Sequence, residues 1–181
     1  AVGDDAHEAL GAELLDDARV HELGRARERE GDVDPRALGK RERSIRGALR
    51  GMKNGTIVID GSAGLEVGMR MRRGTIVVRG PARDFTGLQM KGGTIVLLSG
   101  AEIRTGAWMN RGTIISLKPL HLMPTFAYAT SMFPVFLGLL ARHLKNFGVD
   151  LPGTTDGTYR HYSGDLSVSD KGEILIWQPA A

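Results

Sequence analysis

The residues that could carry chemistry in this chain are five histidines, several serines and a repeating set of cations. No two histidines are spaced to share one face of a helix, and the His-Glu-x-x-His pattern of zinc enzymes is absent. The serines lack the Gly-x-Ser-x-Gly context of a nucleophile elbow, and no phosphate-binding Gly-x-x-x-x-Gly-Lys-Ser/Thr loop occurs. The chain has no cysteine, which excludes disulfides, thiolate metal sites, cysteine-ligated iron–sulfur clusters and a cysteine nucleophile. We therefore expect no metal site and no catalytic residues in this chain.

One polar feature does repeat, and it is basic. Lys53, Arg72 and Lys91 occupy one position of three successive sequence repeats, and Arg73 and Arg111 occupy the position that follows it. We call these five residues the basic stripe. They predict either a solvated corner that keeps the protein soluble or a track for an anionic chain or an acidic partner surface. Aromatic residues are not interleaved with the basic stripe, which argues against binding of single-stranded nucleic acid.

The basic stripe belongs to a repeat of 19 residues that is marked by glycine. The tetrad Gly-Thr-Ile-Val or Gly-Thr-Ile-Ile begins at Gly55, Gly74, Gly93 and Gly112, with no insertions between the copies. Such a unit is too short for a helix–turn–helix repeat or a propeller blade, and it carries one β-branched run bounded by glycines. It can bury its apolar side chains only by stacking on neighbours of the same kind. The repeat therefore predicts an all-β protein in which each unit forms one coil of a parallel β-helix, or β-solenoid.

Alternation along each predicted strand assigns its side chains to two faces. The residues expected inside are Ile57, Ile76, Ile95 and Ile114, then Ile59, Val78, Leu97 and Ser116, and the methionines Met52, Met71, Met90 and Met109. The residues expected outside are Val58, Val77, Val96 and Ile115. A sheet that is apolar on both sides needs a cover. We expect this cover from the chain's own helix together with another subunit.

The pattern changes on both sides of the regular coils. Apolar residues recur at helical spacing from Ser131 to Phe147, which predicts one amphipathic helix inserted near the C-terminus. An irregular connector is expected from Lys118 to Tyr128, and a closing strand is expected at Gly172–Trp177. The predicted divisions are 1–46 for degenerate coils or a cap, 47–117 for the regular coils, 118–150 for the connector and helix, and 151–181 for a loop and the closing strand.

Length, charge and hydropathy limit the class of protein further. The 181 residues suit one domain with an appendage, and a net charge of +3 is too mildly basic to indicate nucleic acid. Acidic residues begin at Asp4, so no secretory signal is expected. The most apolar stretch, Met132–Leu140, is too short to span a bilayer. We expect a cytoplasmic protein that binds no membrane.

The Gly-x-x-Met-x-x-Gly-Thr-Ile-Val coils resemble the C subunit of formylmethanofuran dehydrogenases and the related C-terminal domain of glutamate synthase large subunits. Four further segments look like the C subunit of the formyltransferase/hydrolase complex of methylotrophic bacteria. They are Leu122–Tyr128, Pro134–Leu137, Tyr162–Leu166 and Gly172–Ile176. The resemblance covers residues 47–178, whereas residues 1–46 depart from the regular N-terminal coils of that family.

The resemblance implies a right-handed parallel β-helix in a hetero-oligomer with A, B and D subunits. Such a complex moves a formyl group from formyl-tetrahydromethanopterin to a methanofuran-type cofactor and hydrolyses it to formate in one-carbon metabolism. The chemistry would reside in a metal-dependent amidohydrolase-like A subunit and a formyltransferase D subunit, so this chain would be a non-catalytic scaffold. The chain is expected to hold no cofactor for chemistry of its own. The methanofuran-type cofactor of the complex carries a polyglutamate tail, however, and the basic stripe is a candidate track for that tail.

Three other identities stay open. The chain could be the C subunit of a formylmethanofuran dehydrogenase, a stand-alone binding solenoid, or a β-helix structural domain of a glutamate synthase-like protein. The helix insertion and the missing catalytic domains count against the last of these.

Overall fold

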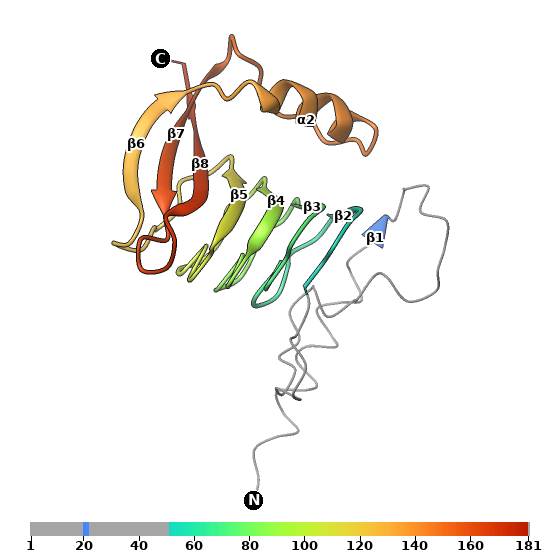
Figure 1. The fold of residues 1–181 in the computed structure, drawn as a ribbon. Coiled ribbons are helices and arrows are strands. Elements are labelled where there is room, and N and C mark those ends of the chain that lie inside the picture. Colours follow the sequence, from blue (N-terminus) through green and yellow to red (C-terminus); the bar gives the residue numbers. More distant parts are fainter. Residues whose placement is uncertain (1–19, 22–50, 181) are drawn as a thin grey trace, which may run out of the picture.

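The computed structural model describes residues 20–21 and 51–180 (Figure 1). The predicted degenerate coils or cap at 1–46 lie outside the described residues, apart from the two-residue strand β1. The described part forms one open eight-stranded sheet and one helix, which confirms the all-β class. The elements are β1 (Val20–His21), β2 (Thr56–Ile59), β3 (Thr75–Val78), β4 (Lys91–Leu97), β5 (Arg111–Ser116), β6 (Ala127–Met132), α2 (Phe136–Lys145), β7 (Gly157–Gly164) and β8 (Lys171–Pro179).

The strands of the four repeats lie side by side in parallel and keep the register of the repeat. Ile57 of β2 lies opposite Ile76 of β3, which lies opposite Ile95 of β4, and β5 continues the series. Since equal positions face each other, every strand offers its neighbour the same side-chain shape. The segments after the strands stack in the same way, through parallel bridges that join Ala63, Ala82 and Ala101.

The inner face of the stack holds the predicted core. Every residue expected inside is buried, and the isoleucine and methionine columns belong to one apolar cluster. Ile76, Ile95 and Ile114 are completely inaccessible to solvent. Burying an isoleucine side chain of this kind stabilises the fold by about 1.5–3 kcal/mol. The alternation that the sequence predicted is therefore confirmed.

The outer face is covered by the chain's own helix. The four residues of the predicted outer column are at most 1% exposed, and they pack with Leu137 and Leu144 of α2. In Figure 1, α2 runs from the C-terminal strands back along the stack. The cover expected from the apolar pattern is thus supplied, at least over this column, by the chain itself.

A single arginine anchors the end of the helix to the stack. Nη2 of Arg79, at the end of β3, donates hydrogen bonds to the carbonyl oxygens of Phe147 at 3.0 Å and Gly148 at 2.9 Å. These are among the last carbonyls of the helix region, where a cation also meets the negative end of the helix dipole. The Nε of Arg79 lies 2.9 Å from the carboxylate of Asp60 in the preceding unit. The anchor therefore links two units and the helix.

The C-terminal part differs from the sequence prediction. The helix begins at Phe136 instead of Ser131, and the predicted irregular connector ends in strand β6. β6 pairs antiparallel with β7, and β7 pairs antiparallel with β8, which lies parallel to β5. The sequence of β6, Ala-Tyr-Ala-Thr-Ser-Met, lacks alternation of apolar and polar residues, so this strand depends on its pairing with β7. The domain boundaries remain a prediction.

Candidate functional site

The basic stripe lies where each unit passes from a buried methionine into its strand. The backbone N–H groups of Arg72 and Lys91 donate to the carbonyl oxygens of Met52 and Met71 at 2.8 and 2.7 Å, which stacks these cations on successive units. Lys91 of β4 lies opposite Arg111 of β5. All five side chains of the basic stripe are exposed. The structure therefore brings together the residues that the repeat placed at neighbouring positions.

A sixth cation extends the row and was missed in the sequence. Lys171, at the start of β8, is exposed and lies opposite Arg111. The pair Lys171-Gly172 repeats Arg111-Gly112 at the start of a strand, and this similarity is the signal that could have revealed it. Neighbouring strands are about 4.8 Å apart, so Lys91, Arg111 and Lys171 form a row across three adjacent strands. Within residues 51–180, no carboxylate forms an ion pair with any of the six cations.

A glycine and a half-buried threonine follow the basic stripe in each unit. Gly93 has a φ of +90°, and a Cβ there would lie 3.0 Å from the carbonyl oxygen of Gly74 and 2.7 Å from Cε of Met71, so only glycine fits without strain. The threonine after each such glycine lies on the outer face. In the part of the chain that the structure describes, the hydroxyls of Thr75 and Thr94 have no partner within the protein. The basic stripe is thus followed in the chain by threonine hydroxyls without a partner among the described residues.

The threonines at both ends of this row have side-chain partners. The hydroxyl of Thr56 lies 3.2 Å from Nε2 of His143 on α2. At the other end, the hydroxyl of Thr113 donates to Glu173 at 2.6 Å, and the second oxygen of Glu173 lies 3.3 Å from Nε2 of His161. These two histidines therefore have partners within the fold.

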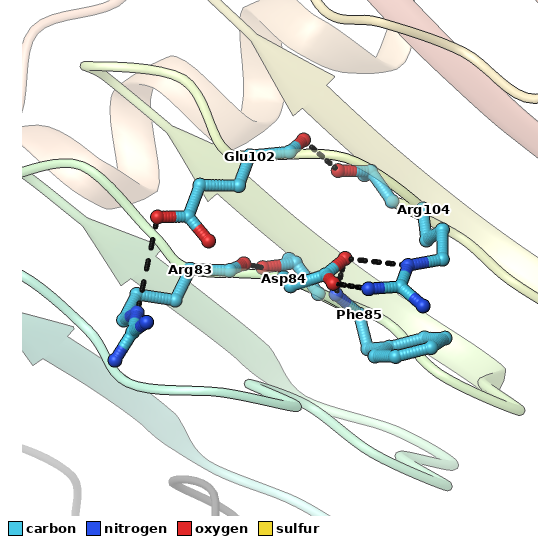
Figure 2. A network of polar contacts seen from close by, with 7 residues as sticks. Arg83, Asp84, Phe85, Glu102 and Arg104 are labelled. Carbon is cyan, nitrogen blue, oxygen red and sulfur yellow. Dashed lines mark hydrogen bonds and ion pairs between the residues drawn. The ribbon is translucent and has the colours of Figure 1, made fainter.

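A second polar cluster fastens two neighbouring units together (Figure 2). Asp84 is 7% exposed; it accepts a hydrogen bond from the N–H of Phe85 at 2.8 Å and forms an ion pair with Arg104 of the next unit. The guanidinium of Arg104 also lies 4.1 Å from the centroid of the Phe85 ring. Arg83 and Glu102 form a longer contact of 3.8 Å between the same units. Because every group here has a partner in the adjacent unit, the cluster is structural.

Asp165 ends a ladder of backbone hydrogen bonds. The N–H of Arg70 donates to the carbonyl of Leu88, and the N–H of Gln89 donates to that of Ala107, each at 2.8 Å. In the corresponding place of the next unit, the N–H of Trp108 donates to the carboxylate of Asp165 at 2.9 Å. The side chain of Asp165 therefore takes the role that a further unit's carbonyl would have.

The environment of Asp165 keeps it ionised. Burial alone would raise the pKa of this carboxyl, but hydrogen bonds from Ser167 and Trp108 outweigh burial and hold the pKa below its ordinary value of 3.8. Both the N–H and the hydroxyl of Ser167 donate to it, at 2.9 and 2.6 Å. Ser169 adds a further hydrogen bond at this end of the stack, since its hydroxyl donates to the carbonyl of Asn110 at 2.6 Å.

Tyr159 is the other titratable group whose environment is unusual. It is completely buried under the helix side of the sheet, with its ring centroid 4.9 Å from that of Trp177 and 5.8 Å from that of Phe133. Burial raises the pKa of its hydroxyl to about 12. The hydroxyl has no hydrogen-bond partner among the described residues. Its role is therefore packing.

In residues 20–21 and 51–180, no three His, Cys, Asp or Glu side chains are grouped so that they could hold a metal ion. No helix in the same part of the chain has the length and apolar character needed to cross a membrane.

The chain is similar to known proteins both in sequence and in fold. No protein-family profile matches this chain. Over 55 residues the chain is 42% identical to the C subunit of the formyltransferase/hydrolase complex Fhc of Methylorubrum extorquens, a match that covers 30% of this chain and 21% of that protein. A chain in the crystal structure of the formyltransferase/hydrolase complex FhcABCD from M. extorquens, in complex with methylofuran, has a TM-score of 0.63 and 38% identity.

The structural match covers 76% of this chain and 51% of the matched chain. The chain thus spans about half the length of that structural relative. The match extends well beyond the 55 residues aligned by sequence, so the fold as a whole supports the similarity. The resemblance expected from the glycine repeat is confirmed: this chain is similar in sequence to the C subunit of the formyltransferase/hydrolase complex, and in structure to a chain of that complex.

Proposed function

We propose that this chain is the C subunit of a formyltransferase/hydrolase complex and that it assembles with A, B and D subunits. The observation that carries the proposal is the structural match to a chain of the FhcABCD complex at 38% identity over 76% of this chain. The complex would transfer a formyl group from formyl-tetrahydromethanopterin to a methanofuran-type cofactor and release formate, in the cytoplasm.

Within that complex, the part of this chain is structural. The polar clusters of the described residues support this role, because each fastens elements of the fold to one another: Asp84 and Arg104 join two units, Arg79 anchors the helix, and Asp165 ends a ladder. The four units are turns of a right-handed parallel β-helix. The in-register pairing of β2 to β5 and the alanine bridges support that geometry, since a coil must meet the next coil on more than one side.

The basic stripe is the surface of this chain that binds an anionic ligand, and the polyglutamate tail of a methanofuran-type cofactor is the ligand that fits it. An extended chain of carboxylates has charges at regular intervals, as the stacked cations do. The hydroxyls of Thr75 and Thr94 lie alongside and can donate to carboxylate oxygens. The absence of internal ion pairs to these cations within residues 51–180 leaves their charge available.

Native mass spectrometry of the protein purified at its endogenous level tests the assembly. The expected particle contains this chain together with subunits of three other kinds. A free chain near 19.6 kDa would contradict the proposal.

A triple variant tests the basic stripe separately. Arg72→Gln, Lys91→Gln and Arg111→Gln together should reduce the amount of cofactor that copurifies with the complex, while the mass of the complex stays the same. A matched triple variant, Lys118→Gln, Arg142→Gln and Lys145→Gln, removes three exposed cations elsewhere and should retain the cofactor. Equal retention by both variants would refute the assignment of the basic stripe.

A further inference from the structure

Strand β6 is the edge of the sheet that the described residues form, and within them it has no partner on one side. In the strand order of the described residues, β6 is last and pairs only with β7. All six of its residues, Ala127–Met132, are exposed. An edge strand presents backbone N–H and C=O groups that are ready to pair with another strand.

The usual protection of an exposed edge is weak here. Proteins block such edges with charged side chains, proline, bulges or very short strands. β6 carries no charge and no proline, and it is six residues long. Its protection is one irregularity next to Ala129, where the pairing register with β7 shifts between Tyr128 and Thr130. The residues on both sides of this irregularity remain able to pair.

A cation on the neighbouring strand β7 lies beside the ring of Tyr128 in the edge strand. Arg160 of β7 is exposed, and its guanidinium lies 5.3 Å from the ring centroid of Tyr128 and 5.5 Å from that of Tyr162. Among residues 51–180, Arg160 has no carboxylate partner. Arginine and tyrosine are the residue types most enriched at the energetic centres of protein interfaces. The positive charge of Arg160 thus lies close to two aromatic rings.

Exposed apolar side chains continue the same segment of chain. Met132 ends β6 and is 38% exposed, and Val135 and Leu139 follow at 92% and 69%. Val135 and Leu139 are four residues apart, so they project from the same side of the start of α2. They follow β6 within seven residues of the chain.

We propose that β6 is a strand-addition site, at which an extended segment of a partner subunit pairs with Ala127–Met132 and places a carboxylate on Arg160. The backbone of the added strand would satisfy the open edge, and its apolar side chains would pack beside Tyr128 and Met132. The proposal rests on the proposed function, which supplies the partner subunits.

The charge of Arg160 favours an acidic partner strand over a second copy of this chain. A second β6 could pair with the first, but it would bring another uncharged strand and another Arg160. It would leave both cations without a carboxylate, whereas an acidic strand of a different subunit neutralises the charge beside two aromatic rings.

The test uses the assembled complex. Hydrogen exchange should show every amide of β6 protected, because one side of the strand pairs with β7 and the other with the added strand. Without an added strand, the amides that point away from β7 exchange rapidly. A photo-crosslinking residue in place of Thr130 should form a crosslink to another subunit, close in sequence to an aspartate or glutamate.

A charge-reversal variant tests whether Arg160 contributes to binding of the partner strand. Arg160→Glu should lower the share of this chain found in the complex by about tenfold or more, whereas Lys118→Glu, at an exposed lysine far along the chain, should leave it unchanged. Unchanged protection of the β3, β4 and β5 amides in the Arg160→Glu variant would show that it folds.

The outcomes distinguish this inference from the proposed function. Rapid exchange of alternate β6 amides in an intact complex, or crosslinks to a second copy of this chain alone, would overturn the strand-addition site and leave the subunit assignment standing. Failure of the wild-type chain to assemble with other subunits would overturn both.

Discussion

Replacing Asp165 by alanine should destabilise the end of the stack more than any other single change of an acidic residue in the described chain. The carboxylate is 1% exposed and accepts hydrogen bonds from Trp108 and from both donors of Ser167. Hydrogen bonds to a charged group contribute about 1.5–3 kcal/mol, and a donor left unsatisfied costs about 1–3 kcal/mol. The hydroxyl of Ser167 can turn toward water, but the N–H groups of Ser167 and Trp108 are fixed by the backbone. We therefore expect a loss of about 3 kcal/mol in the free energy of unfolding.

The pH dependence of this loss has a definite sign. Because the pKa of Asp165 is lowered in the folded protein, its ionised form stabilises the fold fully above the ordinary value of 3.8. That contribution disappears as the pH falls through the lower folded value. The difference between wild type and Asp165→Ala should therefore be constant near neutral pH and shrink below about pH 4.

Urea denaturation of the full chain between about pH 7 and pH 3 measures this difference. Asp150→Ala removes an exposed carboxylate and should change stability by less than about 0.5 kcal/mol. Hydrogen exchange adds a local measurement: the amide of Trp108 should exchange faster in Asp165→Ala, while the amide of Gln89, which donates to a backbone carbonyl, should not. A loss below about 0.5 kcal/mol, or a Trp108 amide that stays protected, would refute the role of Asp165 as the end of the ladder.

Two further predictions concern the repeat itself. Ile95→Ala should lower the free energy of unfolding by about 2–5 kcal/mol, because Ile95 is fully buried. Thr94→Ala, on the outer face, should lower it by less than about 1 kcal/mol. Chemical denaturation measures both variants, and equal losses would contradict the assignment of faces. Gly93→Ala should cost about 1–3 kcal/mol because of its φ of +90° and its close contacts, while Gly138→Ala at the third residue of α2, where a Cβ would meet no other atom, should stabilise by about 0.5–1 kcal/mol. Thermal unfolding should thus shift in opposite directions for the two glycines, and a shift in the same direction would be evidence against this account.

The repeated part of the fold could be predicted because its information is local and redundant. Four copies of one pattern identify the strands, and alternation within each strand assigns Ile95 inward and Val96 outward. The need for a cover over the outer column also followed, and the apolar periodicity located the helix that provides it. The same redundancy placed the cations of the basic stripe on successive units.

The features that the sequence did not reveal depend on contacts between distant residues. β6 has no distinguishing pattern, and it exists because β7, about thirty residues later, pairs with it. Asp165 is one aspartate among many in the sequence, and its role appears only when it meets Trp108, which is 57 residues away. Lys171 was hidden because the repeat is interrupted by the helix before it resumes at β8.

The shared register of β2, β3 and β4 constrains how the chain can change in length. Removing residues 75–93 would join Gly74 to Thr94, so that β2 would meet β4 in the pairing that it now has with β3. Removing one residue within a strand would instead turn the isoleucine that follows it toward the opposite face. A change in the number of units therefore keeps the strands paired when it removes or adds a whole repeat, and each such step changes the distance between the two ends of the stack by one strand spacing, about 4.8 Å.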